Sequence, residues 1–263
     1  MRYRPIDHDP EDPRLGRFIP DDWEHVESYP LTALPPEERP TQSPVVIGVN
    51  WYAEFDNPEE DADSGETFIA RGGADSLTRV RGGHCVCLEP GGEMTDRDEW
   101  RTFYDQGKEG ACVGFGWSRC MSILNGQETG SQYAARWLWD RAKEKDQWPE
   151  TNPGDNNGTS VRSAAEILVA SGHVPWAEDY ADDEYTERTG YQADAAQGLT
   201  AFRWAQAVDE VHGVLANEKA DELGAVPILN SWGEGYPARV WMPDDVLDRL
   251  MKEEGEIAIP TDR

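Results

Sequence analysis

Two short segments of the chain carry the residue types of a thiol nucleophile and its helpers. Residues 106–112 read QGKEGAC, so Gln106 stands six positions before Cys112 in a glycine-flanked turn. Residues 230–233 read NSWG, which sets the amide of Asn230 close to an indole. A cysteine attacks as its thiolate, and it needs a base, a group that orients the base, and donors for the oxyanion that forms. The two segments supply every one of these groups except the base.

The residues around Cys112 predict how its thiol becomes reactive. The apolar residues that follow it recur at helical spacing, so Cys112 is expected at a helix start, where the dipole stabilises a thiolate. Gln106 is expected to point its amide at the oxyanion, together with the backbone N–H of Cys112. Gly110, Ala111 and Gly114 would let a substrate backbone approach. A turn glutamine beside a small buried thiol is the alternative interpretation of this segment.

Asn230 follows a short apolar run, where its amide can hydrogen-bond a histidine ring and fix the tautomer. Trp232 would then shield that hydrogen bond from water. A strand that turns at Gly233, with Trp232 in the core, would give the same four residues without any activity. The occurrence of both segments in one chain favours a catalytic site.

Composition limits the class of protein and its partners. The chain has 263 residues, 38% of them hydrophobic and 11 of them tryptophan, which indicates a folded protein with a substantial core. It carries 52 acidic and 24 basic side chains, a net charge of −28. Such a field repels phosphates and anionic membranes, so neither nucleic acid nor membrane is expected as a partner. A high-salt setting and a GC-rich genome remain alternative causes of this acidity.

The four cysteines are expected to be free thiols made in a reducing cytoplasm. No apolar run reaches the roughly 18 residues of a membrane span, and no secretory signal follows Met1. Cys85 and Cys87 form a C-x-C without a second Cys/His pair at ligand spacing. Two strand thiols are therefore favoured over zinc, and neither a metal nor a cofactor is expected.

Hydrophobic periodicity predicts strands near both ends of the chain and helices in its middle. Strands are expected at residues 43–52, 80–88, 226–230, 238–241 and 256–260. Helices are expected at residues 113–124, 131–143, 160–171 and 205–220, and from Pro243 onward. Thr159 or Ser160 would cap the third of these helices. In the second strand, alternation places His84, Val86 and Leu88 on one face.

This order of elements divides the chain into four parts. The polar, proline-rich residues 1–43 form an extended N-terminal arm, and residues 44–103 form the first part of a β subdomain. Residues 104–200 form a helical subdomain that carries Cys112, and residues 201–263 return to the β subdomain. The expected fold class is α+β, with the helical subdomain packed against an antiparallel sheet or barrel assembled from both chain ends.

The two motifs resemble those of the papain-like cysteine peptidases. Residues 106–112 match that family's oxyanion-hole glutamine and nucleophile at the same step, and residues 230–233 match its asparagine motif word for word. Residues 104–116 and 158–162 are similar to papain-like proteins encoded by tailed bacteriophages of actinobacteria, a resemblance that covers most of the chain. The resemblance implies a papain-like fold and a Cys-His-Asn triad.

The chain departs from the family pattern at three places, of which the first and third concern the substrate cleft more than the nucleophile. Val113 replaces the aromatic residue that usually follows the cysteine, and Glu109 stands where secreted members carry a disulfide cysteine. After NSWG, residues 235–237 replace a second Trp-Gly. The residues expected to contact a substrate are Gly110, Trp232, Gly158 and Thr159, with Trp51, Tyr52 and Asn157 as further candidates for the cleft.

The base is the group that the family order does not supply. The family has cysteine, histidine and asparagine in that order, but only His173 and His212 follow Cys112. His212 lies in a helical pattern, and His173 follows a helix-ending glycine. His84 enters an apolar strand in GHCV, similar to the family's GHAV. We therefore expect His84 as the base, on a strand moved ahead of the cysteine by circular permutation. His212 and the lack of any catalytic histidine are the alternatives.

The expected function is that of a thiol peptidase, phage-encoded and acting on virion or host peptides. The rival is a virion structural or tail-associated protein that keeps the fold as a binding module, with the arm packed on other virion proteins. A transglutaminase or cell-wall amidase is a third class, and the NSWG motif speaks against it. The expected location is the host cytoplasm during synthesis, with incorporation into the virion left open and no secretion by a signal peptide.

Overall fold

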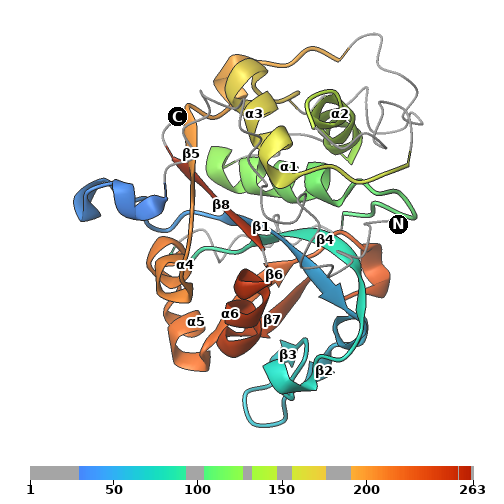
Figure 1. Cartoon of the computed structure of the whole chain (residues 1–263), viewed down its shortest axis with the longest axis vertical. Helices are drawn as coiled ribbons and strands as arrows, with labels where there is room; N and C mark the ends of the chain where they lie inside the picture. Colours follow the sequence, from blue (N-terminus) through green and yellow to red (C-terminus); the bar gives the residue numbers. More distant parts are fainter. Residues whose placement is uncertain are drawn as a thin grey trace, which may run out of the picture.

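The computed structural model describes residues 30–92, 104–126, 132–146, 156–175, 191–253 and 255–261. Within these ranges the chain is an α+β protein in which one sheet lies between two groups of helices (Figure 1). The expected fold class is thus confirmed. Across the same ranges, no helix has the length and apolar character needed to cross a membrane.

The central strands of the sheet come from the N-terminal part of the chain and their neighbours from the C-terminal part. The strand order is β2-β3-β7-β6-β4-β1-β8-β5. The strands are β1 (Val45–Tyr52), β2 (Glu59–Glu60), β3 (Thr67–Phe68), β4 (Val80–Leu88), β5 (Ala201–Trp204), β6 (Ala225–Leu229), β7 (Arg239–Pro243) and β8 (Glu256–Thr261). All paired strands are antiparallel except β3 and β7. The sheet is therefore built from both parts of the chain, as expected.

Three of these strands escape prediction for physical reasons. β2 and β3 span only two residues each, in a stretch rich in Asp, Glu and Gly that shows no strand pattern. β5 is half-buried along its whole length, so it shows neither an apolar run nor a clear alternation. Among the strands of the sheet in the described residues its one neighbour is β8, so it lies at the edge.

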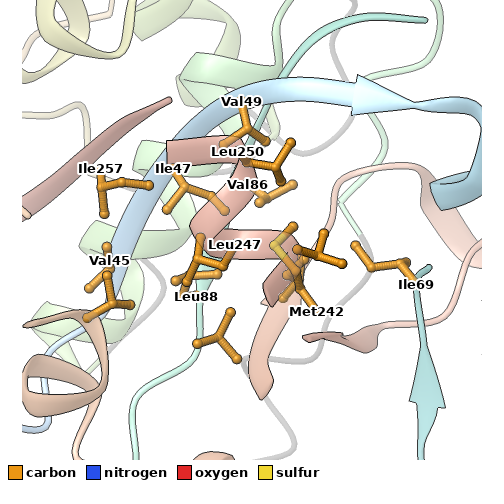
Figure 2. Packing of buried hydrophobic residues seen from close by; sticks show 14 of the residues in the cluster. Val45, Ile47, Val49, Ile69, Val86, Leu88, Met242, Leu247, Leu250 and Ile257 are labelled. Carbon is orange, nitrogen blue, oxygen red and sulfur yellow. The ribbon is translucent and has the colours of Figure 1, made fainter. Parts of the chain in front are cut away.

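Successive side chains of β1 and β4 point to opposite faces of the sheet, and each face has its own hydrophobic core. Ile47 of β1 pairs with Val86 of β4, and both belong to the larger core, which α6 covers with Leu247 and Leu250 (Figure 2). Cys85 of β4 points the other way, into the core beneath α1. The period of a strand thus assigns adjacent residues of β4 to opposite layers.

Each face of the sheet carries its own group of helices (Figure 1). On one face lie α1 (Cys112–Asn125), α2 (Gln132–Lys143) and α3 (Val161–Ser171). On the other lie α4 (Val208–Leu215), α5 (Glu218–Leu223) and α6 (Asp244–Lys252). Of the two residues considered as the α3 cap, it is Ser160 whose hydroxyl accepts the N–H of Ser163, at 3.0 Å. The expected cap of α2, Ser131, lies outside the described residues.

The single helix expected over residues 205–220 is wrong. The chain leaves the helix at Ala216, whose φ is 45°, and starts a second helix after Asn217. The Asn217 side chain accepts the N–H of Ala220 at 3.1 Å and so caps α5. An alanine in the left-handed region has no sequence signal, and the apolar spacing continues across the break.

Part of the N-terminal arm lies along the edge of the sheet. Pro30 forms a parallel bridge with Trp204 of β5, and two short 3-10 turns follow, at Leu31–Ala33 and Pro36–Glu38. Residues 1–29 of the predicted arm lie outside the described residues. The division into four parts stays a prediction.

Candidate active site

Cys112 is the first residue of α1, as the sequence predicts. Its side chain is buried, and burial raises the pKa of the thiol to about 11. The backbone N–H groups of Cys85, Val113 and Cys112 itself act in the opposite direction and lower this pKa. The thiol is therefore neutral in this conformation, although it faces donors that would stabilise a thiolate.

A close approach of α1 to β4 brings the thiol against the Cys85 amide. Gly116 lies one helical turn after Cys112, and a Cβ built on it would stand 2.9 Å from the Cys85 sulfur. Residues four apart share a face of a helix, so this face of α1 presses directly on the strand. Any larger side chain at residue 116 would lift the helix from β4.

His84 is held by the asparagine of the second motif. The Nε2–H of His84 donates to Oδ1 of Asn230 at 2.7 Å, across 146 residues of sequence. The same oxygen accepts the backbone N–H of Ser231 at 2.7 Å, which fixes the orientation of the amide. Because Nε2 carries the proton, Nδ1 of His84 carries the lone pair.

The imidazole of His84 is neutral and available as a base. Burial lowers its pKa to about 4, and the hydrogen bond to Asn230 acts in the opposite direction. Nδ1 has no hydrogen-bond partner among the described residues, so the imidazole and the Cys112 thiol are not hydrogen-bonded in this conformation. His84 directly precedes Cys85, whose backbone N–H faces that thiol. The ring and the thiol thus flank the same stretch of β4.

Aromatic rings enclose the imidazole. Trp51 packs edge-on against His84 with ring centroids 4.7 Å apart, and Trp232 lies 5.0 Å from it at a tilt. The two indoles also contact each other at 5.1 Å. Tyr236 supports Trp232 from behind at 5.1 Å. The rings exclude water from the hydrogen bond that orients the base.

The sequence makes Trp51 a candidate for the cleft but does not predict its contact with His84. Val49 of β1 pairs with His84, so Trp51 is the diagonal neighbour of His84 on the same face. Gly82 of β4 pairs with Trp51 and carries no side chain beside this indole. The register of the two strands is the signal that would have revealed the contact, and it is not readable from either strand alone.

Gln106 connects the two sequence motifs. Its side-chain Oε1 accepts the hydroxyl of Ser231 at 2.7 Å, and its backbone N–H donates to the Ser231 carbonyl at 2.9 Å. Its Nε2 donates one hydrogen to the carbonyl of Glu109 at 2.9 Å. An amide nitrogen carries two hydrogens, so one remains for another acceptor. The side chain is fully buried and held at both ends.

The expected substrate-contact residues differ in where they lie. Gly110 and Gly158 are adjacent, since a Cβ on Gly110 would stand 2.9 Å from the Gly158 nitrogen. Trp232 is half-buried beside His84. Thr159 is fully buried, and its hydroxyl donates to Asp146 at 2.6 Å, so its side chain points into the interior.

The space beside Gly114 is not left for a substrate, and that expectation is wrong. A Cβ on Gly114 would stand 2.0 Å from the Ala135 carbonyl oxygen of α2 and 2.9 Å from the Trp139 Cβ. Glycine is needed here because the two helices cross at this point. The sequence shows the small residue but not which neighbour requires it.

The other histidines of the described residues have different partners. His212 uses both ring nitrogens, with Asp221 at 2.7 Å and Asp244 at 2.8 Å, on the far group of helices. His173 is buried in the helical layer, where its Nε2 and the Ser118 hydroxyl are 2.8 Å apart. His8 and His25 lie outside the described residues. Among the described histidines, Asn230 contacts His84 alone.

The cysteines of the C-x-C segment lie in the core between β4 and α1. Within the described ranges, no group of three or more His, Cys, Asp or Glu side chains is arranged to hold a metal ion. The four candidate catalytic residues are all buried, with exposed fractions of 2% for Cys112, 1% for His84, 0% for Gln106 and 7% for Asn230. The arrangement supplies a nucleophile, a base, an orienting amide and an amide donor in a closed conformation.

Neither a protein-family model nor a curated protein sequence matches the chain. Several proteases are among the solved structures that have a similar overall fold. Xylellain from Xylella fastidiosa is 16% identical, with a TM-score of 0.45 over 67% of this chain and 87% of that one. The protease CMS1MS2 of Carica candamarcensis is 14% identical, with a TM-score of 0.41 over 62% and 97%. Procathepsin L2 of Tenebrio molitor is 13% identical, with a TM-score of 0.39 over 63% and 66%. At such scores and identities the likeness assigns neither an activity nor a site residue.

Proposed function

We propose that this chain is a thiol peptidase with a Cys112, His84 and Asn230 triad. The observation that carries the proposal is the 2.7 Å hydrogen bond from His84 to Asn230, which leaves a buried Nδ1 with its lone pair free of any described partner. The Cys112 thiol lies against the peptide N–H that follows His84. A neutral imidazole with its far nitrogen fixed by an amide is what a general base for a thiol requires.

In the proposed reaction, Nδ1 of His84 takes the proton of Cys112 and the thiolate attacks the peptide carbonyl. The remaining N–H of Gln106 and the backbone N–H of Cys112 donate to the oxyanion. His84 then protonates the leaving amine, and water hydrolyses the acyl-enzyme with His84 again as the base. Gly110, Gly158 and Trp232 are proposed to border the substrate, while Thr159 supports the segment from inside.

The pKa values of Cys112 and His84 in this structure indicate what must change before the proposed reaction can start. Burial raises the pKa of Cys112 to about 11 and lowers that of His84 to about 4, so the closed site favours the neutral pair. Contact between thiolate and imidazolium would lower the first pKa and raise the second, because opposite charges stabilise each other. The proposed enzyme therefore needs a conformational change that brings the thiol to Nδ1 and admits a substrate.

The proposal includes a circular permutation and a phage origin. β4 precedes α1 in the chain but lies between β6 and β1 in the sheet, beside the strand that leads into Asn230. A sheet keeps a site whatever the order of its strands, so displacement of the His84 strand is compatible with the same chemistry. The sequence resemblance supports a tailed-phage source with virion or host peptides as substrates. The net charge of −28 favours basic peptides among them.

A second candidate is a virion structural or tail-associated protein that keeps this fold as a binding module, with the N-terminal arm contacting other virion proteins. The burial of all four site residues favours this candidate, because a closed site with a neutral thiol has no catalytic use until it opens. Either candidate permits the same fold. Only a measurement of thiol reactivity separates them.

The test is labelling of the protein by an epoxide electrophile, together with cleavage of a mixed fluorogenic peptide library. Wild type should be labelled and active, while Cys112→Ala and His84→Ala should lose both activities. His212→Ala is the matched control and should keep both, since His212 is bound to Asp221 and Asp244. Activity in His84→Ala, or its loss in His212→Ala, would refute the assignment of the base. An unlabelled wild type whose thiol titrates at or above the ordinary value near 8.5 would favour the binding module.

A further inference from the structure

The side chain of Asn156 clips the loop that precedes Cys112. Its Oδ1 accepts the backbone N–H of Gly110 at 3.1 Å, and its Nδ2 donates to the carbonyl of Lys108 at 3.2 Å. These two groups flank Glu109, so one amide holds the main chain on both sides of that residue. A primary amide carries a donor and an acceptor side by side, so the Asn156 side chain binds the main chain of residues 108–110 as a neighbouring β-strand would.

The held residue, Glu109, is one of two that orient the side-chain amide of Gln106, and Ser231 is the other. The Glu109 carbonyl accepts the first Nε2 hydrogen of Gln106 at 2.9 Å. The direction of this bond sets the direction of the second hydrogen, because the amide is planar. A displacement of Glu109 would therefore turn the donor that the proposed reaction uses. The path runs from Asn156 through residues 108–110 to Gln106.

Further contacts hold both segments that the Asn156 side chain joins, residues 108–110 and residues 156–157. A Cβ on Gly110 would stand 2.8 Å from the Asn156 carbonyl oxygen, so the two main chains touch and the spacing cannot drift. Trp139 of α2 donates its indole N–H to the Asn157 carbonyl at 2.9 Å. Arg136, also of α2, is ion-paired with Glu109 and donates to the carbonyl of Asp105. Helix α2 thus backs both the loop and the segment that clips it.

We propose that Asn156 is a positioning residue for the oxyanion-binding amide of Gln106, acting through the main chain of residues 108–110. The inference rests on the proposed function and deepens it. It assigns to an exposed side chain, which no motif singles out, a role in the chemical step. All of the contacts that hold the loop in place are non-covalent, so the arrangement persists in a reducing compartment.

A merely structural role would predict a different set of effects. If Asn156 only stabilises the fold, Asn156→Ala should lower the melting temperature and leave the kinetic constants of the folded enzyme unchanged. If it positions Gln106, kcat should fall while KM changes little, since the oxyanion donor acts only in the transition state. Asn217→Ala is the matched control: it also removes an asparagine that accepts a backbone N–H, but on the other face of the sheet.

The experiment measures two quantities on the full chain. The first is kcat and KM for a fluorogenic peptide in Asn156→Ala, Gln106→Ala, the double variant and Asn217→Ala. The second is hydrogen exchange of the Gly110 amide, which reports on the clip whether or not the protein is a peptidase. Asn156→Asp is the second variant: it keeps the acceptor for Gly110 and loses the donor to Lys108, so it should show a smaller effect if truncation to alanine prevents folding.

The expected result is about a tenfold to hundredfold fall of kcat in Asn156→Ala, with faster exchange at Gly110. In the Gln106→Ala background, Asn156→Ala should cause little further loss. Asn217→Ala should lower the melting temperature without changing kcat. Unchanged Gly110 exchange in Asn156→Ala would overturn the clip. Faster exchange with an unchanged kcat, or full additivity with Gln106→Ala, would overturn the positioning role. A wild type without peptidase activity would refute the proposed function, and Gly110 exchange would still decide on the clip.

Discussion

Removal of the Asn230 amide tests the central hydrogen bond of the proposed site. Asn230→Ala deletes the oxygen that lies 2.7 Å from Nε2 of His84. In the transition state this bond would be donated by an imidazolium, and hydrogen bonds to charged groups contribute about 1.5–3 kcal/mol. At roughly 1.4 kcal/mol per factor of ten, kcat/KM should fall about 10- to 150-fold. The bond also raises the pKa of His84, so its loss should lower that pKa further.

The assay is kcat/KM for a fluorogenic peptide, paired with the pH dependence of Cys112 alkylation by iodoacetamide. Alkylation at neutral pH should slow in Asn230→Ala, because less imidazolium is available to stabilise the thiolate. Asn230→Asp is the matched variant: it keeps an acceptor at the same place and adds a negative charge that raises the pKa of His84. Opposite displacements of the two pH profiles are expected. Identical profiles and rates in wild type and both variants would refute the role of this hydrogen bond.

Two further predictions concern stability. Gly114→Ala should destabilise the fold by about 1–3 kcal/mol or more, because its Cβ would meet the Ala135 carbonyl at 2.0 Å. Gly213→Ala on α4 should instead stabilise the fold by roughly 0.5–1 kcal/mol, because its Cβ would meet nothing within 4 Å. Denaturant unfolding measures both changes, and effects of the same sign would contradict the packing of α1 on α2. Burial lowers the pKa of His212, but its hydrogen bonds to Asp244 and Asp221 outweigh burial and raise it above 6.5. The bridged imidazolium should therefore add at most about 1 kcal/mol, fully present below pH 6.5 and lost as the pH rises through the raised pKa. In His212→Ala this pH-dependent part of the unfolding free energy should vanish, and its persistence would assign it to another group.

Local sequence patterns predict the helix and the strand that carry Cys112 and His84 better than they predict the elements around them. Cys112 begins a helix as the apolar spacing after it indicates, and the strand that carries His84 has the predicted bounds, residues 80–88. The break at Ala216 and the half-buried strand β5 depend on tertiary contacts that outweigh local pattern.

Contacts between distant segments are what the sequence could not supply. The edge contact of Trp51 with His84 depends on the register of β1 with β4. The clip by Asn156 depends on where the segment after α2 returns to the loop before α1. Gly114 shows the same limit, because its lack of a side chain is explained only by the helix that crosses it.

The pairing of β1 with β8 has a consequence for the order of events on the ribosome. Val46 pairs with Ala258, so the central strand of the sheet has no neighbour on one side until nearly all of the described chain has been synthesised. Cys112 and His84 emerge early, while Asn230 and both of its flanking strands emerge late. A nascent or prematurely terminated chain therefore carries the thiol without the structure that would orient its base. The proposed site can therefore assemble only after the residues of β8 have been synthesised.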